Sequence, residues 1–282
     1  MSPLHLVVVI AAVAAAFAWL ASLATGDTSW IDRLWSVLPE TYVWVFALRA
    51  GLSDTRLDVM AILTTAWGLR LTFNFARRGG YTGTEDYRWA VLRSSMRRWQ
   101  FQLFNLFFIV VYQSFLLVLI ALPAFTAYQH RGAAFGPLDA FLTTLFVAML
   151  VGETVADQQQ WNFQRRKRIV TLAGDEPTTR FLQAGLFRYA RHPNYFFEIA
   201  QWWIVFLFGA VAARSLAQWT LIGPVLLSAL FVGSTSFTEK ISRSRYPEYE
   251  HYQRTTSAIV PWFSRARSIV TADESAQLPP WS

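Results

Sequence analysis

The stretch that decides the fold reads Gly185-Leu186-Phe187-Arg188-Tyr189-Ala190-Arg191-His192-Pro193-Asn194-Tyr195-Phe196-Phe197-Glu198. Its last eleven residues hold two Arg, two Tyr, a His, an Asn and a Glu. Residues 199–213 follow without a single charged side chain. A dense polar cluster therefore stands at the mouth of a membrane segment, where polar side chains are costly unless they bind something.

The composition of the whole chain agrees with a membrane protein. Of its 282 residues, 54% are hydrophobic, 16% are aromatic and only 15% are charged, whereas soluble domains carry about 25% charged residues. Several uncharged runs approach the roughly 20 residues that span a bilayer. We therefore expect an all-α integral membrane protein. The chain has no Cys and its four His are scattered, so we expect no disulfide and no metal site.

The apolar runs on either side of the central stretch predict seven transmembrane helices. They are expected at residues 4–25, 35–52, 57–76, 99–128, 139–156, the stretch that ends near 213, and 218–237. The first run lacks the basic start of a signal peptide, so we interpret it as a retained helix. Pro123 is expected to end or kink the fourth helix. We interpret residues 1–268 as one membrane domain and residues 269–282 as a disordered tail.

The positive charge predicts the orientation. The basic residues are 23 Arg and 2 Lys, and the net charge is +7. Nucleic-acid binding would explain such a bias, but basic loops on the cytoplasmic side explain it more simply in a membrane protein. The Arg-rich segments follow the third, fifth and seventh predicted helices, which places the N-terminus outside and the C-terminus in the cytoplasm. We expect membrane lipids and a small molecule as partners, with no nucleic acid and no obligate protein partner.

Two polar segments are candidates for a cofactor site. Residues 157–168 combine Asp157 with the basic run that contains Arg166. Arg side chains bind phosphates and carboxylates bind ribose hydroxyls, so a nucleotide fits, although lipid headgroups fit the same charges. In the central stretch, His192-Pro193 should break the local helix, and the next helix should start near Asn194 as its N-cap, where free N–H groups suit an anion. The alternative is a capped helix with interfacial Arg and Tyr anchors.

The candidates for the reacting end of the site are Asp32, Arg70, Asp86 and Tyr87. A buried carboxyl near the membrane interface tends to be protonated, and it can then hydrogen-bond a carbonyl oxygen or donate a proton. Asp32 and Arg70 also fit a simple ion pair. In the tail, residues 243–254 alternate basic and aromatic side chains, which suits either an adenine clamp or an interfacial helix.

The central motif resembles the C-terminal-domain family of the steroid 5-alpha-reductases, in particular its bacterial membrane branch. The similarity covers most of the chain. It includes Gly185-Leu186-Phe187-x-Tyr189-x-Arg191-His192-Pro193-Asn194-Tyr195-x-x-Glu198, Asp32-x-x-Trp35, Glu85-Asp86-Tyr87-Arg88-Trp89, Glu153-x-x-x-Asp157, Arg180 and Tyr246-x-x-Tyr249-x-x-Tyr252.

This resemblance implies a seven-helix membrane reductase that uses NADPH. A hydride would pass from the nicotinamide to the β-carbon of an enone in a lipid-like or steroid-like substrate, and a side-chain acid would stabilise the enolate. The acid candidates are Asp32, Asp86 and Tyr87. The expected cofactor-binding residues are Asp157, Arg166, Arg180, Arg188, Tyr189, Arg191, His192, Asn194, Tyr195, Glu198 and Tyr246.

Two departures from the reductase pattern bear on the substrate. Trp67 stands near the position at which the steroid enzymes carry a Tyr, and residues 233–237 replace a His- and Arg-rich run. Cofactor chemistry is therefore better supported than a steroid substrate. The isoprenylcysteine carboxyl methyltransferases share an Arg-His-Pro-x-Tyr motif and bind S-adenosylmethionine, but the many Arg residues favour a polyphosphate ligand. A non-enzymatic lipid-binding protein is the third interpretation.

Overall fold

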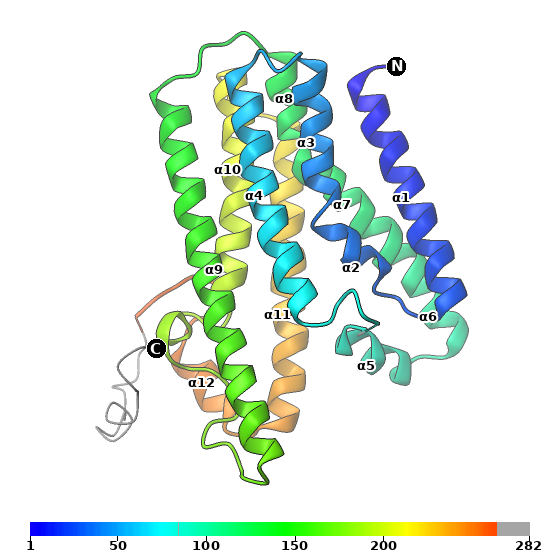
Figure 1. Cartoon of the computed structure of the whole chain (residues 1–282), viewed down its shortest axis with the longest axis vertical. Coiled ribbons are helices and arrows are strands. Elements are labelled where there is room, and N and C mark those ends of the chain that lie inside the picture. Colours follow the sequence, from blue (N-terminus) through cyan, green and yellow to red (C-terminus); the bar gives the residue numbers. More distant parts are fainter. Residues whose placement is uncertain (84, 264–282) are drawn as a thin grey trace.

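The computed structural model describes residues 1–83 and 85–263, and within these ranges it contains helices and no strand. Figure 1 shows the helices as one elongated bundle. In chain order they are α1 (Pro3–Thr25), α2 (Trp30–Trp35), α3 (Leu38–Arg49), α4 (Thr55–Arg77), α5 (Tyr87–Ser95), α6 (Arg98–Phe104), η1 (Asn105–Tyr112), α7 (Gln113–Ala121), α8 (Pro123–Gln129), α9 (Pro137–Leu172), η2 (Gly185–Arg188), α10 (Pro193–Ala213), η3 (Trp219–Leu221), α11 (Ile222–Arg245) and α12 (Tyr249–Thr255). The predicted disordered tail at 269–282 lies outside the described residues.

Six helical segments of the described chain are long and apolar enough to cross a membrane. They are Pro3–Thr25, Thr55–Arg77, Arg98–Gln129, Pro137–Leu172, Pro193–Ala213 and Trp219–Arg245. The side chains Val13, Phe17 and Leu20 of α1 are at least half exposed, as expected for a helix that faces lipid. These features support the prediction of an integral membrane protein.

The predicted helix at 35–52 is divided in the structure, so six spans rather than seven meet the length criterion. Helix α2 ends at Trp35, and α3 starts only at Leu38, with Pro39 in its first turn. Its 12 residues extend about 18 Å, well short of the ~30 Å hydrocarbon core. A single hydropathy run from 35 to 52 does not show this break, because the linking residues Ser36 and Val37 are uncharged.

The fourth span is not a regular helix. It begins as α6, continues through the π-helix η1 at Asn105–Tyr112, and becomes α7. As predicted, Pro123 interrupts it, and α8 starts at that proline. The π-helix was not predicted. Such segments often occur at functional sites, and η1 contributes to the cavity described below.

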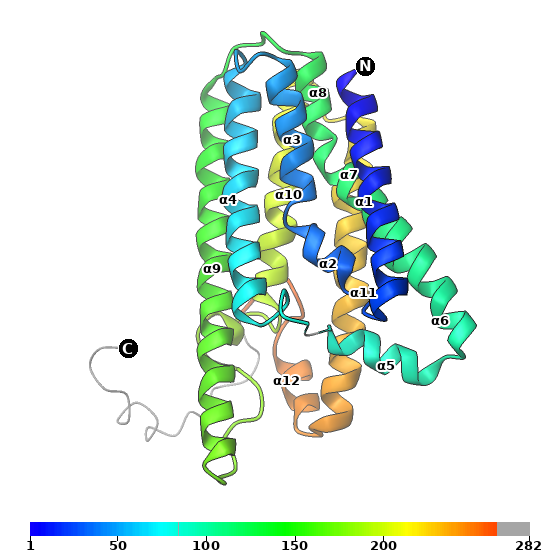
Figure 2. The ribbon, with the colours of Figure 1, turned by 45° about the vertical axis from the view of Figure 1, so that its right-hand side comes forward.

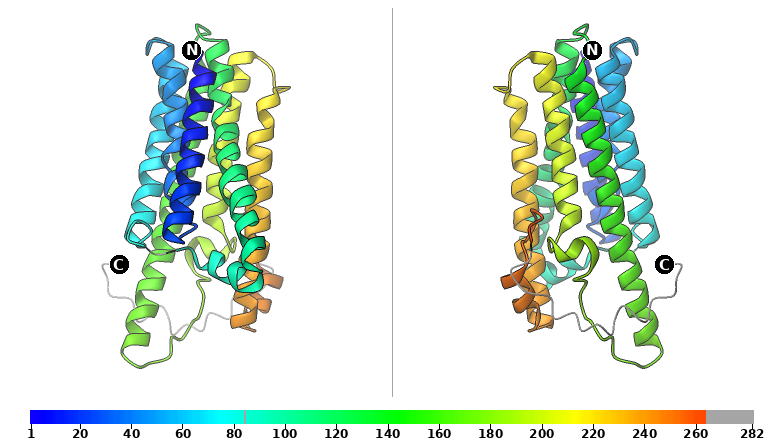
Figure 3. Two further views of the ribbon diagram at one scale, coloured as in Figure 1. Left: turned by 90° about the vertical axis from the view of Figure 1, so that its right-hand side faces the viewer. Right: turned by 90° about the vertical axis from the view of Figure 1, so that its left-hand side faces the viewer.

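The bundle core is formed by α3, α4, α7, α8, α9 and α10. Trp67 of α4 and Trp202 of α10 are both almost fully buried, and their rings meet edge to face at 4.8 Å. Figure 2 shows α10 between α4 and α11, and Figure 3 shows α4 and α11 at opposite sides of the bundle. This core fixes α4 and α10 as the two central elements of the site.

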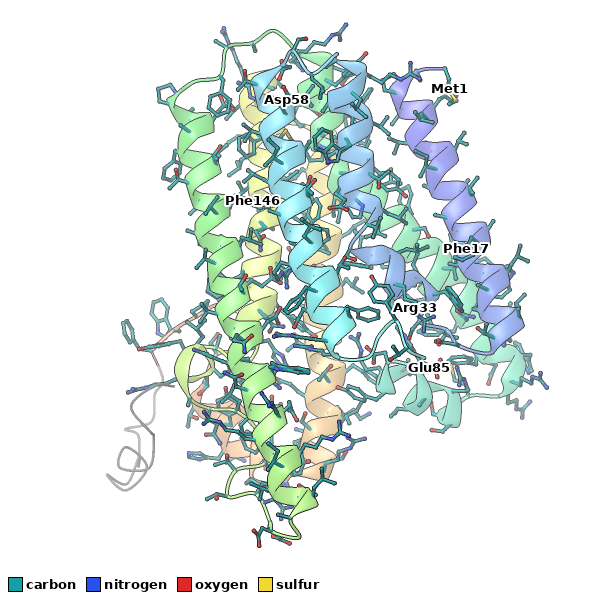
Figure 4. All side chains as sticks on the ribbon, in the orientation of Figure 1. Met1, Phe17, Arg33, Asp58, Glu85 and Phe146 are labelled. Atoms are coloured by element: carbon teal, nitrogen blue, oxygen red, sulfur yellow. The ribbon has the colours of Figure 1, made fainter. Side chains whose placement is uncertain are left out.

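The two ends of the bundle differ in charge. The N-terminus and Asp58 lie at one end, and Arg33 and Glu85 lie toward the other (Figure 4). The C-terminal ends of α4, α9 and α11 and the segments that follow them lie at the second end. We call it the basic end because these parts carry Arg77, Arg78, Arg165, Arg166, Arg168, Arg188, Arg243 and Arg245. Helix α9 has 36 residues, about 54 Å, and it extends beyond its neighbours at the basic end.

Candidate functional site

A cavity of about 640 Å³ is lined by the C-terminal half of α4 and the first turns of α10, among other elements. It lies between α2, α4, α5, the α6–η1–α7 segment, α9, α10 and α11. The lining side chains include Asp32, Trp35, Arg70, Asn74, Arg78, Asp86, Arg88, Trp89, Phe104, Phe108, Tyr112, Gln113, Glu153, Asp157, Asn194, Tyr195, Glu198, Leu230, Phe231, Ser234 and Phe237.

One wall of the cavity is polar because three helices each present a pair of polar side chains four residues apart. In a helix, residues i and i+4 share a face. The pairs are Arg70 and Asn74 on α4, Glu153 and Asp157 on α9, and Asn194 and Glu198 on α10. The residues of the motifs Glu153-x-x-x-Asp157 and Asn194-x-x-x-Glu198 therefore lie on neighbouring faces of two adjacent helices.

Arg70 is the centre of this wall. Its guanidinium lies 2.7 Å from a carboxylate oxygen of Glu153 and 2.7 Å from one of Asp157. Asn74 donates a hydrogen bond of 2.7 Å to Asp157, and Gln201 donates one of 2.7 Å to Glu153. The acids are almost completely buried. Burying these two carboxylates side by side would be costly without the donors that bind them.

A second wall comes from α2 and α5. Trp89 donates its indole N–H to Asp32 at 3.0 Å. Asp86 caps α5 through the backbone N–H of Arg88, and it also binds the Arg88 guanidinium at 2.7 Å. Arg88 donates a further hydrogen bond of 2.7 Å to Ser234 of α11. These contacts tie α5 to both α2 and α11 across the cavity.

Burial raises the pKa of the Asp32 carboxyl above its ordinary value, and nearby Asp86 raises it further, whereas the Trp89 hydrogen bond and Arg88 oppose the rise. A carboxyl in such a place is more often protonated than one in water, and it can donate a hydrogen bond to a ligand oxygen. Asp32 does not pair with Arg70, which binds Glu153 and Asp157 instead. The alternative interpretation of an Asp32–Arg70 ion pair is therefore wrong.

The remaining wall is apolar. Phe104, Phe108 and Tyr112 succeed one another at intervals of four along α6 and η1 and stack nearly parallel. The ring centroids are 4.9 Å and 5.4 Å apart, with interplanar angles of 20° and 9°. Phe231 and Phe237 of α11 lie on the same cavity. The cavity thus combines a charged wall with a flat aromatic wall, which suits a ligand with one polar and one apolar part.

The structure brings six of the predicted site residues together on the cavity. Two of them are acid candidates and four are cofactor candidates: Asp32, Asp86, Asp157, Asn194, Tyr195 and Glu198. The third acid candidate, Tyr87, does not line it. Its side chain is 47% exposed, and its ring lies 5.9 Å from the Arg245 guanidinium.

The other predicted cofactor residues lie off the cavity wall. Arg191 and His192 both bind Glu239 of α11. Lys167 donates to the carbonyl of Arg180 at 2.7 Å and to the Tyr246 hydroxyl at 3.2 Å. Arg166, Arg188 and Tyr189 are exposed at the basic end. A cofactor role for these seven residues stays a prediction.

Asn194 is not an N-cap, contrary to the sequence-based prediction. Helix α10 begins at Pro193 and His192 takes the cap position, because proline is favoured in the first turn, where its missing N–H is not needed. Asn194 lies inside the first turn instead, and its side chain is free to line the cavity.

Several cavity residues were not predicted as site residues. Glu153 was seen only as part of a motif, and Asn74, Arg78 and Ser234 were not singled out. The spacing of Asn74 and Arg78 from Arg70, four and eight residues along one helix face, is the signal that would have found them.

Comparison with known proteins gives a family and one curated relative. A family model described as "Protein of unknown function (DUF1295)" matches residues 18–256. The chain is similar to "Uncharacterized protein C594.04c" of Schizosaccharomyces pombe, with 36% identity over 273 residues, 92% of this chain and 79% of the yeast protein. No solved structure matches significantly.

Proposed function

The chain belongs to the DUF1295 family of proteins of unknown function, and on that premise we propose that it is a membrane-embedded, NADPH-dependent reductase. Its substrate would be a lipid-like molecule with a C=C bond activated by a neighbouring carbonyl group. The observation that carries the proposal is the cavity itself. It joins Asn194 and Glu198, from the motif that resembles the reductases, to a carboxyl with raised pKa and to an aromatic wall.

The polar wall supports binding of the nicotinamide end. A carboxamide offers one acceptor and two donors, and Asn194 and Glu198 on one face of α10 supply a matching donor and acceptors. Arg78 lines the cavity with its side chain 45% exposed. The phosphates would then extend toward Arg78 and the exposed Arg residues of the basic end, where charge-assisted contacts are available.

The cavity wall formed by α2 and α5 supports the proposed reduction of the substrate. NADPH would supply the hydride to the β-carbon, and the electrons of the C=C bond would move to the carbonyl oxygen. Protonated Asp32 would donate a hydrogen bond to that oxygen, and a proton would reach the α-carbon to complete the reduction. Phe104, Phe108 and Tyr112 would hold the apolar part of the substrate and exclude water.

The proposal includes the topology. In this arrangement the second of seven passes, predicted at 35–52, runs through α3. The chain must return once between α1 and α4, because both of these helices run toward the basic end. The basic end would be cytoplasmic by the positive-inside rule, with the N-terminus outside. In a bacterium this would be the inner membrane, and the cavity would open to cytoplasmic NADPH.

One observation favours a second candidate, an S-adenosylmethionine-dependent methyltransferase. The lining residues include five acids, Asp32, Asp86, Glu153, Asp157 and Glu198, but only three Arg. An excess of carboxylates suits a cationic sulfonium better than a polyphosphate.

Thermal unfolding of the detergent-purified protein tests both candidates. NADPH, NADH and S-adenosylmethionine are compared in parallel. A ligand at 100 times its dissociation constant adds about 2.7 kcal/mol to the free energy of unfolding. Stabilisation by NADPH that is lost in Asn194→Ala and kept in Asn162→Ala, an exposed control on α9, supports the reductase. Stabilisation by S-adenosylmethionine alone supports methyl transfer, and no shift with any ligand contradicts both.

A further inference from the structure

Arg191 and His192 are prominent in the central motif, yet their side chains are used within the protein. Arg191 Nε and Nη2 lie 2.6 Å and 3.0 Å from the two carboxylate oxygens of Glu239. Arg191 Nη1 donates to the backbone carbonyls of Gln253, at 2.9 Å, and Thr256. All three guanidinium nitrogens therefore have protein acceptors.

Glu239 collects donors from two other elements. His192 Nε2 lies 3.1 Å from its carboxylate. From α12 and its C-terminal end, Gln253 donates a hydrogen bond of 2.8 Å and Tyr249 donates one of 3.4 Å. The Glu239 side chain is 8% exposed. One buried carboxylate thus joins α11, the entrance of α10 and the C-terminal segment, and Figure 3 shows α12 beside the lower end of α11.

The backbone continues the same connection. Residues 189–192 run beside residues 257–262 and form one isolated parallel bridge. Three hydrogen bonds join these segments: Arg191 N–H to Ser257 O at 2.8 Å, His192 N–H to Ala258 O at 3.0 Å, and Trp262 N–H to Tyr189 O at 2.9 Å.

These contacts end one residue before the first turn of α10. The His192 ring also stacks on Tyr195, with centroids 5.2 Å apart and planes within 16°, and Tyr195 lines the cavity. The α10 entrance has no side-chain cap of its own. Its orientation therefore depends on what holds the residues in front of it.

We infer that Glu239, acting through Arg191 and His192, is a positioning residue for the cavity. It locks the C-terminal segment onto the entrance of α10 and so keeps Asn194, Tyr195 and Glu198 directed into the cavity. In this assignment the Arg-His-Pro-Asn motif is divided by role. Arg191 and His192 hold the backbone, while Asn194 meets the ligand. Only the ligand-binding part of the test rests on the proposed NADPH function.

Amide hydrogen exchange of the full-length protein in detergent tests the inference directly. In Glu239→Gln, exchange at residues 189–198 should become faster while exchange in α1 and α3 stays unchanged. Gln253→Ala removes one hydrogen-bond donor to Glu239 without leaving an unpaired buried charge. It should therefore speed exchange at the same residues, by a smaller factor. This variant keeps the test valid if Glu239→Gln does not fold. Glu248→Gln is the control, because Glu248 is exposed and its nearest cation, Arg180, is 3.9 Å away.

The dissociation constant of NADPH, measured in parallel, distinguishes a residue that positions the cavity side chains from one that only stabilises the fold. If the inference holds, Glu239→Gln weakens NADPH at least about tenfold, as expected when a first-turn contact is misplaced, and Glu239→Asp restores part of the affinity. Unchanged exchange at 189–198 in both Glu239→Gln and Gln253→Ala would overturn the inference, as would faster exchange with unchanged affinity. If wild-type protein binds no NADPH, the proposed function fails, and the exchange result still decides whether Glu239 positions α10.

Discussion

Arg70 and Asp157, 87 residues apart in the chain, meet at 2.7 Å on the wall of the cavity. The Arg70 side chain is 10% exposed and that of Asp157 is 5% exposed. Arg70 also lies 2.7 Å from Glu153, so a single guanidinium compensates two buried carboxylates. Removing one member of such a buried group is costly, because the remaining charges lose their compensation.

The first prediction follows from that imbalance. Arg70→Met should lower the free energy of unfolding by about 3–5 kcal/mol, because it leaves buried carboxylates without their main counter-charge. Thermal unfolding in detergent measures the change. Arg165→Met removes an exposed Arg from α9 and serves as the control, with a midpoint close to wild type. Equal stability of the two variants would mean that the acids near Arg70 are protonated or solvated.

The second prediction concerns the pH dependence that Asp32 confers. Its pKa is raised above the ordinary value of 3.8 in the folded protein, so the folded state binds the proton more tightly than the unfolded chain does. The stability contribution is then complete below the unfolded pKa and is lost as the pH rises through the raised folded pKa. Asp32→Asn removes this pH-dependent contribution to the free energy of unfolding.

The measurement is the unfolding midpoint of wild type and Asp32→Asn across the acid range. The advantage of the variant over wild type should grow as the pH rises through that window. Asp175→Asn, in the exposed loop after α9, should parallel wild type. A constant difference at every pH would show that Asp32 titrates at the same pH in the folded and unfolded states.

The sequence identified residues that line the cavity more successfully than it predicted which side chains contact one another. Asp32, Asp86, Asp157, Asn194, Tyr195 and Glu198 were singled out from motifs, and all line one cavity. Motif residues at i and i+4 share a helix face wherever the helix goes, so this part needs no knowledge of packing. Arg191 and His192 were assigned to the ligand because a positive charge beside a helix entrance suits anions. The competing acceptor, Glu239, lies 48 residues from Arg191, and no local pattern shows that the two meet.

In the fold, too, local sequence patterns predicted some features, whereas features that depend on packing were not predicted. Long apolar runs predicted the six candidate spans of the described residues, together with a seventh at 35–52 that is divided in the structure. Pro123 predicted the break between α7 and α8. The interruption between α2 and α3 and the π-helix at Asn105–Tyr112 left no mark in hydropathy. Both depend on backbone hydrogen bonding and packing against neighbouring helices, which a window average does not record.

The third prediction concerns the end of the bundle away from the cavity. Arg56 and Asp139 form a nearly fully buried ion pair, with donor–acceptor distances of 2.6 Å and 2.9 Å. Arg56→Leu alone should destabilise the protein by about 3–5 kcal/mol because Asp139 is left buried and unpaired, while the double variant Arg56→Leu with Asp139→Leu should recover most of that loss. Thermal unfolding measures both. Ligand affinity at the cavity should be unchanged in the double variant, and a parallel loss of affinity would show that the two ends are coupled.

The fourth prediction uses two glycines of the same helix, α11. A Cβ on Gly223 would lie 2.7 Å from the carbonyl carbon of Leu119 on α7, whereas a Cβ on Gly233 would meet nothing within 4 Å. Small residues let membrane helices approach closely. Gly223→Ala should therefore force α11 away from α7 and destabilise the protein by about 1–3 kcal/mol.

Gly233→Ala is the matched control for Gly223→Ala, and its effect should have the opposite sign. Alanine is favoured over glycine inside a helix by up to about 1 kcal/mol, and nothing obstructs the added methyl group. Unfolding of both variants in the same detergent gives the comparison. If Gly223→Ala were as stable as Gly233→Ala, the close contact between α11 and α7 would not contribute to the stability of the bundle. A loss only at Gly223 would establish that the close approach of α11 to α7 stabilises the bundle.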